Sequence, residues 1–143
     1  IRRGRVVKFK ILGVMELDSC NREYWEFVRN LRNDRRVSEG FIESIHITPE
    51  MQESYMKTHS KYYRIALLDK KPCGFVGVLD DDIRICTHPS FQRKGVGKFM
   101  LNEIMKIFPK AYGKVKVSNE ISKNLFLSLG FKEEFTIFTR YEK

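Results

Sequence analysis

The chain has 143 residues, of which 42% are hydrophobic and 13% aromatic, and its 27 basic and 18 acidic side chains give a formal charge of +9. This length supports one well-buried core and is too short for two typical domains, so we predict a single domain over residues 1–143. The positive charge favours anionic ligands without choosing among them, and no apolar run approaches the ~20 residues that a membrane-spanning helix needs, so no membrane partner is expected.

The first half of the chain has an alternation of strand and helix periodicities. They predict a strand, two helices and two further strands, in chain order over residues 6–12 (extending toward residue 17), 19–31, 49–59, 61–68 and 73–79. Ser19 can cap the first of these helices, and Thr48 followed by Pro49 is a strong start for the second. The last two strands flank a short polar turn, which predicts a hairpin.

The second half continues the alternation. Strand, helix, strand, helix and strand patterns follow one another over residues 82–89, 96–108, 114–117, 119–129 and 135–141. Gly130 stands where a glycine ends a helix in the left-handed conformation. The chain contains no repeat or linker, so the order of elements predicts one mixed α/β domain.

The three cysteines indicate a reducing compartment. Cys20, Cys73 and Cys86 are odd in number and have no C-x-x-C spacing, which argues against a disulfide framework and against a zinc site. We therefore expect buried, reduced thiols, no metal and a cytoplasmic location.

The most informative stretch is a basic glycine loop between a predicted strand and a predicted helix. Glycines let the backbone approach an anion closely, and the free N–H groups of a first helical turn favour negative charge. The loop therefore reads as a pyrophosphate cradle, although ordinary turn chemistry would use the same glycines. A P-loop and a dinucleotide fold are both disfavoured because their spacings are absent. The loop comprises Gln92, Arg93, Lys94, Gly95, Val96, Gly97 and Lys98.

The run H-P-S-F-Q-R-K-G-V-G at residues 88–97 resembles the loop motif of the GNAT acetyltransferase superfamily. The runs V-S-N-E-I-S at residues 117–122 and L-G-F at residues 129–131 resemble the ending of the same motif set. This resemblance implies an α/β (α+β) fold with a central mixed, mostly antiparallel sheet of about six to seven strands, a splayed strand pair and about four flanking helices. It also implies that acetyl-CoA is the cofactor, with its pyrophosphate on the glycine loop.

A second resemblance lies in the N-terminal third. The run F-V-R-N-L-R-N-D at residues 27–34 and I-T-P-E at residues 47–50 are similar to a pattern in ribosomal-protein and aminosugar N-acetyltransferases. It implies that the acceptor contacts Arg29, Arg32, Asn33 and His46. A polar helix end that caps a loop would use Arg32 and Asn33 equally well.

The transfer chemistry assigns further roles. An attacking amine must be neutral and needs a proton acceptor, while negative charge builds on the thioester carbonyl oxygen. In the resembled fold a backbone N–H near Ile85, Cys86 or Thr87 polarises that carbonyl, and Asp82 takes the place of an acid that relays the amine proton. Glu43, His46 and His59 are rival bases, and a triple aspartate is commonly only a solvated turn.

The last predicted helix departs from the family pattern at the leaving group. Many members carry a tyrosine there to protonate the departing thiolate, whereas this chain has Phe126, which has no proton to give. Ser122, Asn119 or Tyr112 could replace it, the thiolate could leave unassisted, or Phe126 could be simple core packing. The resemblance places Asn119, Asn124 and Phe126 of this helix near the cofactor, and we assign catalytic roles to Asp82, Asn119 and Ser122.

The sequence therefore predicts an acetyl-CoA-dependent N-acetyltransferase that acts on a small amine or a nucleotide-linked aminosugar in a ternary complex. A protein N-terminus is the alternative acceptor, and an acyl-CoA-binding module with weak catalysis is the alternative class. A specific nucleic-acid partner is disfavoured because the cations are spread along the chain without a recognition motif. The sequence also leaves room for a homodimer.

Overall fold

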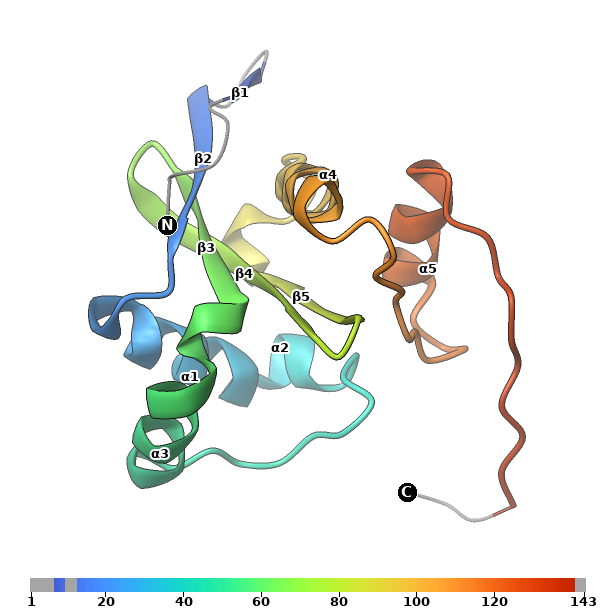
Figure 1. Cartoon of the computed structure of the whole chain (residues 1–143), viewed down its shortest axis with the longest axis horizontal. Helices are drawn as coiled ribbons and strands as arrows, with labels where there is room; N and C mark the ends of the chain where they lie inside the picture. Colours follow the sequence, from blue (N-terminus) through green and yellow to red (C-terminus); the bar gives the residue numbers. More distant parts are fainter. Residues whose placement is uncertain (1–6, 10–12, 141–143) are drawn as a thin grey trace.

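The computed structural model describes residues 7–9 and 13–140 of the chain (Figure 1). Its strands and α-helices are β1 (Val7–Phe9), β2 (Gly13–Ser19), α1 (Trp25–Asn33), α2 (Arg35–Ser38), α3 (Pro49–His59), β3 (Tyr63–Leu68), β4 (Lys71–Leu79), β5 (Asp82–Thr87), α4 (Val96–Ile107) and α5 (Glu120–Ser128). Short 3-10 helices precede α1, β3 and the glycine loop. None of the helices in this part of the chain has the length and apolar character that spanning a bilayer requires.

The described strands form one antiparallel sheet in the order β1-β2-β3-β4-β5. The expected sheet of six to seven strands is therefore wrong for the described residues. Residues 114–117 and 135–140 pair with no strand among the described residues, and a turn begins at Val117, while Tyr141 lies outside the described residues. Apolar alternation predicts an extended backbone, but it cannot supply the neighbour that makes an extended segment a strand.

The sheet is buried on both faces. Along β3, Ile65 and Leu67 belong to a core with α1 and α3, whereas Ala66 and Leu68 belong to a second core with α4. Figure 1 shows α1, α2 and α3 gathered on one side of the sheet and α4 on the other. Because successive strand residues point to opposite faces, this arrangement explains the continuous apolar run that marks the central strands.

The helix predictions hold with one adjustment, which concerns the first helix. Helix α3 begins at Pro49 and is capped by the Thr48 hydroxyl, and α4 begins at Val96, both as predicted. The first helix begins at Trp25 rather than after Ser19, because Ser19 is still paired with Arg64 in the sheet.

Two further elements differ from the expectation. The N-terminal segment is a hairpin of β1 and β2 rather than one strand, although residues 6 and 10–12 lie outside the described residues. The short helix α2 was not anticipated, and with it the described residues hold five α-helices rather than about four. The Asp34 side chain caps α2 by accepting the Arg36 backbone N–H.

The backbones of strand β5 and of the segment that follows α4 are hydrogen-bonded at one position and then diverge. Asp82 and Tyr112 form an isolated parallel bridge, in which the Ile83 N–H donates to the Tyr112 carbonyl at 2.9 Å and the Tyr112 N–H donates to the Asp81 carbonyl at 2.8 Å. No further backbone hydrogen bond joins β5 to residues 113–117 among the described residues. The two segments therefore form a wedge that opens from this bridge.

Gly113 allows the wedge to close at its narrow end. A Cβ atom added there would lie 2.4 Å from Cε1 and Cζ of the Phe126 ring, which no real side-chain contact permits. The ring itself is only 8% exposed and packs edge-on against Phe131 at 4.9 Å between centroids. Glycine is therefore needed at this position so that α5 can pack beside the wedge.

We expect Gly113→Ala to lower the free energy of unfolding by about 1–3 kcal/mol, because the added methyl group overpacks against Phe126. Urea denaturation followed by circular dichroism measures the loss. The double variant Gly113→Ala with Phe126→Leu should recover part of it, since the smaller side chain makes room. A loss that is unchanged in the double variant would show that the Phe126 ring is not the cause.

Candidate active site

A cavity of about 290 Å³ lies in the wedge between β5 and the segment after α4. Residues of four regions line it: the end of α1, the loop after α2, the sheet, and the segment from Lys114 into α5. The lining residues are Arg32, Gly40, Phe41, Ile42, Glu43, Tyr63, Phe75, Asp82, Ile83, Arg84, Ile85, Lys114, Val115, Asn119, Ser122 and Phe126. All three predicted catalytic residues are among them.

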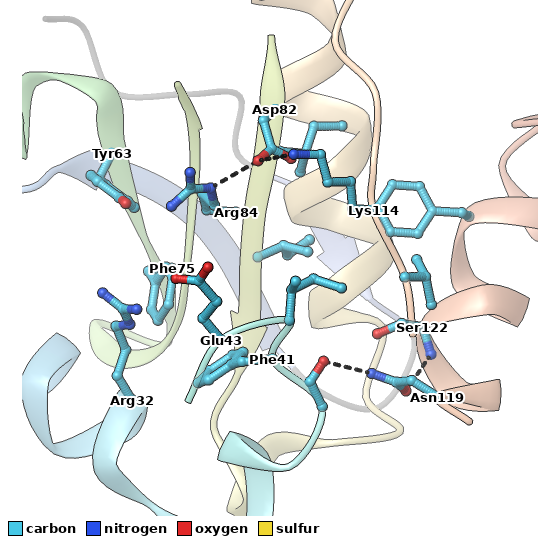
Figure 2. Close-up of a pocket in the computed structure, with 16 residues that line it drawn as sticks. Arg32, Phe41, Glu43, Tyr63, Phe75, Asp82, Arg84, Lys114, Asn119 and Ser122 are labelled. Carbon is cyan, nitrogen blue, oxygen red and sulfur yellow. Dashed lines mark hydrogen bonds and ion pairs between the residues drawn. The ribbon is translucent and has the colours of Figure 1, made fainter. Parts of the chain in front are cut away.

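An ion-pair group stands at the narrow end of the cavity. Arg84 Nε lies 3.3 Å and Lys114 Nζ 3.6 Å from Oδ2 of Asp82, whose side chain is 16% exposed (Figure 2). Asp82 and Arg84 point to the same face of β5 because they are two residues apart on a strand. Both cations approach the same carboxylate oxygen, so Oδ1 has no partner among the described residues and can accept a proton or a hydrogen bond from a ligand.

The opposite end of the cavity combines a cation with aromatic rings. The Arg32 guanidinium lies 5.9 Å from the centre of the Phe41 ring, and it forms no ion pair with any described residue. Figure 2 shows Arg32, Phe41, Glu43 and Tyr63 around the same space. The Tyr63 hydroxyl is engaged behind this wall, 2.8 Å from the Tyr55 hydroxyl, and burial raises its pKa.

Asn119 fixes the start of α5 and ties it to the acceptor side. Its Oδ1 accepts the Ser122 backbone N–H at 3.2 Å, and its Nδ2 donates to the Gly40 carbonyl at 3.4 Å. Both ends of the amide are thus committed to protein contacts. The Ser122 hydroxyl lines the cavity and has no hydrogen-bond partner among the described residues.

Phe126 reaches the cavity as part of its wall. It is the residue that stands in place of the expected tyrosine, and its ring packs between Gly113 and Phe131. Its contacts are those of a core residue with one edge at the cavity. Asn124 is exposed on α5 and does not line the cavity.

The backbone of β5 presents unpaired groups to the wedge. The Ile83 N–H points toward the wedge, where it meets the Tyr112 carbonyl. Since N–H directions alternate along a strand, those of Ile85 and Thr87 point the same way, and that of Cys86 points toward β4. Neither Ile85 nor Thr87 donates its N–H to residues 113–117. Of the three expected carbonyl-polarising positions, the geometry favours Ile85 and Thr87.

The glycine loop has the conformation that an anion cradle needs. Arg93 and Gly95 have φ values of +62° and +83°, so the chain turns sharply before α4 begins at Val96. The first helix-type hydrogen bond is donated by Phe99 to the Gly95 carbonyl, and the N–H groups of residues 95–98 have no acceptor among the described residues. A Cβ on Gly97 would lie 3.2 Å from Leu125 and 3.7 Å from the Thr87 hydroxyl. Gly97 is thus also a packing position.

Three of the four predicted acceptor residues do not line the cavity. Arg29 donates to the Ile47 carbonyl at 3.1 Å, and Asn33 both donates to that carbonyl and accepts the Ile47 N–H, at 2.9 and 2.8 Å. These bonds hold the chain before α3 against α1, which favours a structural role for both residues. His46 is exposed and lies outside the cavity lining, so only Arg32 of this set reaches it.

Sequence reasoning missed Arg84, Lys114, Phe41 and Tyr63 as cavity residues. Arg84 could have been found, because a residue two positions from Asp82 on a strand shares its face. Lys114 could not, because its approach to Asp82 depends on where the chain returns after α4. Phe41 and Tyr63 carry no local signal that separates a cavity wall from a core.

The cysteines are all buried and none lines the cavity. Burial raises the pKa of Cys20, Cys73 and Cys86 to about 12 from an ordinary value of 9.0, with only partial opposition from Arg64 at Cys20 and Arg32 at Cys86. A thiol with such a pKa is neutral at physiological pH and is a poor nucleophile. A covalent acyl-cysteine intermediate therefore has no support here.

A basic glycine loop at a helix start, an unpaired strand edge and a cavity with a carboxylate are together the features of a thioester-using acyltransferase. The model of the acetyltransferase (GNAT) family matches residues 18–131, and the chain belongs to that family. It is accordingly an acyltransferase that uses acetyl-CoA. Among curated proteins, none matches the chain.

Solved structures share the fold at low sequence identity. A spermidine N-acetyltransferase from Vibrio cholerae, in complex with CoA and spermine, has a TM-score of 0.74 and 20% identity, covering 85% of this chain and 82% of that chain. An aminoglycoside N-acetyltransferase in complex with CoA has a TM-score of 0.65 and 20% identity, covering 90% and 95%. A ribosomal L7/L12 α-N-protein acetyltransferase in complex with CoA has a TM-score of 0.69 and 14% identity, covering 92% and 86%.

The buried cysteines allow a direct check of the core. We expect none of the three thiols to react with a disulfide reagent at about pH 8 in the folded protein, and all three to react once urea unfolds it. The pKa of each thiol is higher in the folded than in the unfolded protein, so folding is favoured while the thiols are protonated. The contribution of the buried thiols to the free energy of unfolding is therefore complete below pH 9.0, and it is lost as the pH rises toward about 12. A thiol that reacts rapidly in the folded state would contradict the burial of that cysteine.

Proposed function

We propose that the protein transfers the acetyl group of acetyl-CoA to a primary amine of a small molecule, with a nucleotide-linked aminosugar as the favoured type of acceptor. The transfer occurs by direct attack in a ternary complex. The observation that carries this proposal is one cavity that joins the unpaired edge of β5, the Asp82 carboxylate and the unpaired Arg32 cation. The β5 edge can hydrogen-bond a thioester, and the Asp82 carboxylate can accept the proton of an amine. The Arg32 cation can bind an anionic group on the acceptor.

The cofactor would bind across the wedge. Its pyrophosphate would accept hydrogen bonds from the free N–H groups of residues 95–98, with Arg93, Lys94 and Lys98 adding positive charge. The pantetheine would run along the unpaired edge of β5, where the Ile85 or Thr87 N–H could polarise the thioester carbonyl. This route leads the acetyl group from the loop toward the cavity.

The chemical step needs one proton acceptor and one way to stabilise a thiolate. As the amine nitrogen bonds to the carbonyl carbon, its surplus proton passes to Asp82, directly or through a water molecule, and the carbon–sulfur bond then breaks. The Ser122 hydroxyl, which has no partner among the described residues, can donate a hydrogen bond to the departing sulfur. Asn119 acts by positioning Ser122, because its amide caps the helix that carries it.

The charge of the cavity supports an acceptor that is not a simple polycation. Arg32, Arg84 and Lys114 face two carboxylates, Asp82 and Glu43, and both Arg84 and Lys114 are paired with Asp82. Arg32 is then left to bind a phosphate or carboxylate of the acceptor, with the Phe41 ring beside it. Glu43 remains a rival base or a ligand for the ammonium form of the amine.

A protein N-terminus is the alternative acceptor. It is supported by the similarity in fold to the ribosomal L7/L12 α-N-protein acetyltransferase. An acyl-CoA-binding module with weak catalysis is the alternative class, because Phe126 stands where a proton-donating tyrosine is expected. Both alternatives have distinct outcomes in a transfer assay.

The deciding experiment incubates the protein with acetyl-CoA and a panel of amines while the release of free CoA thiol is measured. The panel contains amines with a phosphate or carboxylate, including a nucleotide-linked aminosugar, as well as polyamines, aminoglycosides and peptides. We expect the anionic amines to give the highest kcat/KM. Preferred acetylation of peptides would support the alternative acceptor, and cofactor binding without release of thiol would support the binding module.

The Arg32→Ala variant tests recognition of the acceptor. We expect the KM for an anionic amine to rise at least about tenfold, because one charge-assisted contact is lost, while the KM for acetyl-CoA stays within about twofold. Arg35→Ala is the matched control, since Arg35 is exposed on α2 and does not line the cavity. Equal changes in both KM values would show that Arg32 supports the fold rather than the acceptor.

The loop is tested by the rise in melting temperature that acetyl-CoA produces. We expect this rise to vanish in Gly97→Asp, which adds a negative charge where the phosphates would bind, and to shrink in Lys98→Ala. Gly97→Ala is the control for bulk alone, because the one close neighbour of its Cβ is the movable Leu125 side chain at 3.2 Å, and the Thr87 hydroxyl at 3.7 Å is at ordinary contact distance. If Gly97→Asp kept the full rise, the pyrophosphate would have to bind elsewhere.

A further inference from the structure

The wall of the cavity holds a primary amine that belongs to the chain itself. Among the described residues that line the cavity, the basic side chains are those of Arg32, Arg84 and Lys114. A guanidinium stays protonated in proteins, whereas a lysine amine becomes a nucleophile once it has lost a proton. Lys114 is therefore the one lining residue, within the described part of the chain, that has the chemistry of an amine acceptor.

Lys114 lies beside the group that we assign as the proton acceptor. Its Nζ atom is 3.6 Å from Oδ2 of Asp82, and its side chain is 50% exposed (Figure 2). Arg84 contacts the same oxygen, so Oδ1 of Asp82 has no partner among the described residues. The folded chain alone thus brings a primary amine close to a carboxylate with an available oxygen.

The same cavity connects this amine with the position that we assign to the thioester. Lys114 and Ile85 both line it, and the Ile85 N–H is one of the two groups expected to polarise the thioester carbonyl. Along β5, Ile85 is about 10 Å from Asp82, since each strand residue adds about 3.3 Å. A lysine ammonium is carried on a flexible four-carbon stem. The Lys114 amine can therefore turn from Asp82 toward the carbonyl carbon without a change in the backbone.

The other lysines near the site are placed differently. Lys116 Nζ donates to the Glu39 carbonyl at 2.8 Å and does not line the cavity. Lys94 and Lys98 belong to the glycine loop, where positive charge suits the pyrophosphate. Lys110 is exposed in the turn after α4 and lies outside the cavity lining, so it serves as a reference for an ordinary surface amine.

We propose that Lys114 is a site of self-acetylation, which occurs when bound acetyl-CoA meets no amine substrate in the cavity. After the ammonium has lost a proton to water, the neutral Nζ bonds to the carbonyl carbon of the thioester. Its surplus proton passes to Asp82, and the carbon–sulfur bond breaks. The products are Nε-acetyl-lysine and a CoA thiolate, which takes a proton from the solvent. Self-acetylation depends on the proposed function, because it needs the thioester and Asp82 in one cavity.

The modification changes both the charge and the volume of the site. Acetylation removes the positive charge of a lysine, so Asp82 keeps Arg84 as its one cationic partner among the described residues. The acetyl group also enlarges a side chain in the wall of a cavity of about 290 Å³. The acetylated protein therefore has a less positive and narrower acceptor site.

The first test compares Lys114 with Lys110 in the same molecule. The protein is incubated with acetyl-CoA alone, and acetylation of each lysine is followed by mass spectrometry of its peptides. We expect Lys114 to react at least about tenfold faster than Lys110, because the thioester is held beside one amine only.

Acetic anhydride is the control reagent, because it acetylates lysines without a binding site. With it the preference should reverse, since the Lys114 amine is paired with Asp82 while Lys110 is exposed. The same ratio of the two rates with both reagents would overturn the proposal, because the reaction of Lys114 would then reflect only the reactivity of its amine.

A matched pair of variants tests the proton transfer. Asp82→Asn should slow acetylation of Lys114 by acetyl-CoA at least about tenfold, because an amide cannot accept the proton. Its acetylation by acetic anhydride should not fall, since the amine loses an ion pair. Asp81→Asn is the control, because Asp81 is exposed and does not line the cavity, and the rate should stay within about twofold. Equal rates in the two variants would contradict the role of Asp82.

A labelling experiment separates reaction within one molecule from reaction between two. The Asp82→Asn chain is labelled with 15N, mixed with the unlabelled protein and incubated with acetyl-CoA. We expect acetyl-Lys114 only in unlabelled peptides, because the labelled chain lacks its own proton acceptor. Equal acetylation of both chains would overturn the proposal, because one molecule would then modify another.

Failure of self-acetylation and failure of the proposed function give different results. Release of CoA thiol with an amine of the panel, but no acetylation of Lys114 by acetyl-CoA alone, would overturn self-acetylation and leave the proposed function intact. If no amine released thiol and acetyl-CoA did not raise the melting temperature, the proposed function would fail, and self-acetylation would fail with it.

Discussion

The site depends on the point at which backbone pairing stops. Strand β5 is bonded along one side to β4. On its other side, the bridge between Asp82 and Tyr112 is its only backbone pairing within the described part of the chain. Unpaired strand groups are normally a cost, since each needs a partner when it is removed from water. In an acetyltransferase the unpaired groups of such a strand are available to the cosubstrate, because the amide of a pantetheine arm and the carbonyl of a thioester can hydrogen-bond to them.

The same bridge fixes the charges of the cavity. It places Lys114, two residues beyond Tyr112, near the carboxylate of Asp82, which already lies beside Arg84 on the same face of the strand. The carboxylate thereby contacts cations from both sides of the wedge. A change in the wedge would alter these contacts as well as the cavity, so the shape and the electrostatics of the site are set by one element of structure.

The sequence predicted those features whose causes are local. The cap at Thr48, the glycine at the start of α4 and the hairpin of β3 and β4 each depend on a few neighbouring residues, and the structure has all three. The strand predicted over residues 114–117 failed because strand formation depends on a partner, which periodicity does not reveal. The cavity lining follows the same rule. Motifs in the sequence pointed to Asp82, Asn119 and Ser122, whereas Lys114 and Phe41 line the cavity only because of how the chain folds.

Asn33 shows why a motif residue and a site residue can differ. It belongs to the run that resembles acceptor-binding positions, yet its amide is used twice on the backbone of Ile47. Arg32, one position earlier on α1, points instead toward the cavity and has no carboxylate partner among the described residues. On a helix, neighbouring positions lie about 100° apart, so one can anchor a loop while the next faces a ligand. The motif thus locates the helix end, and the helical turn decides which of its side chains faces the cavity.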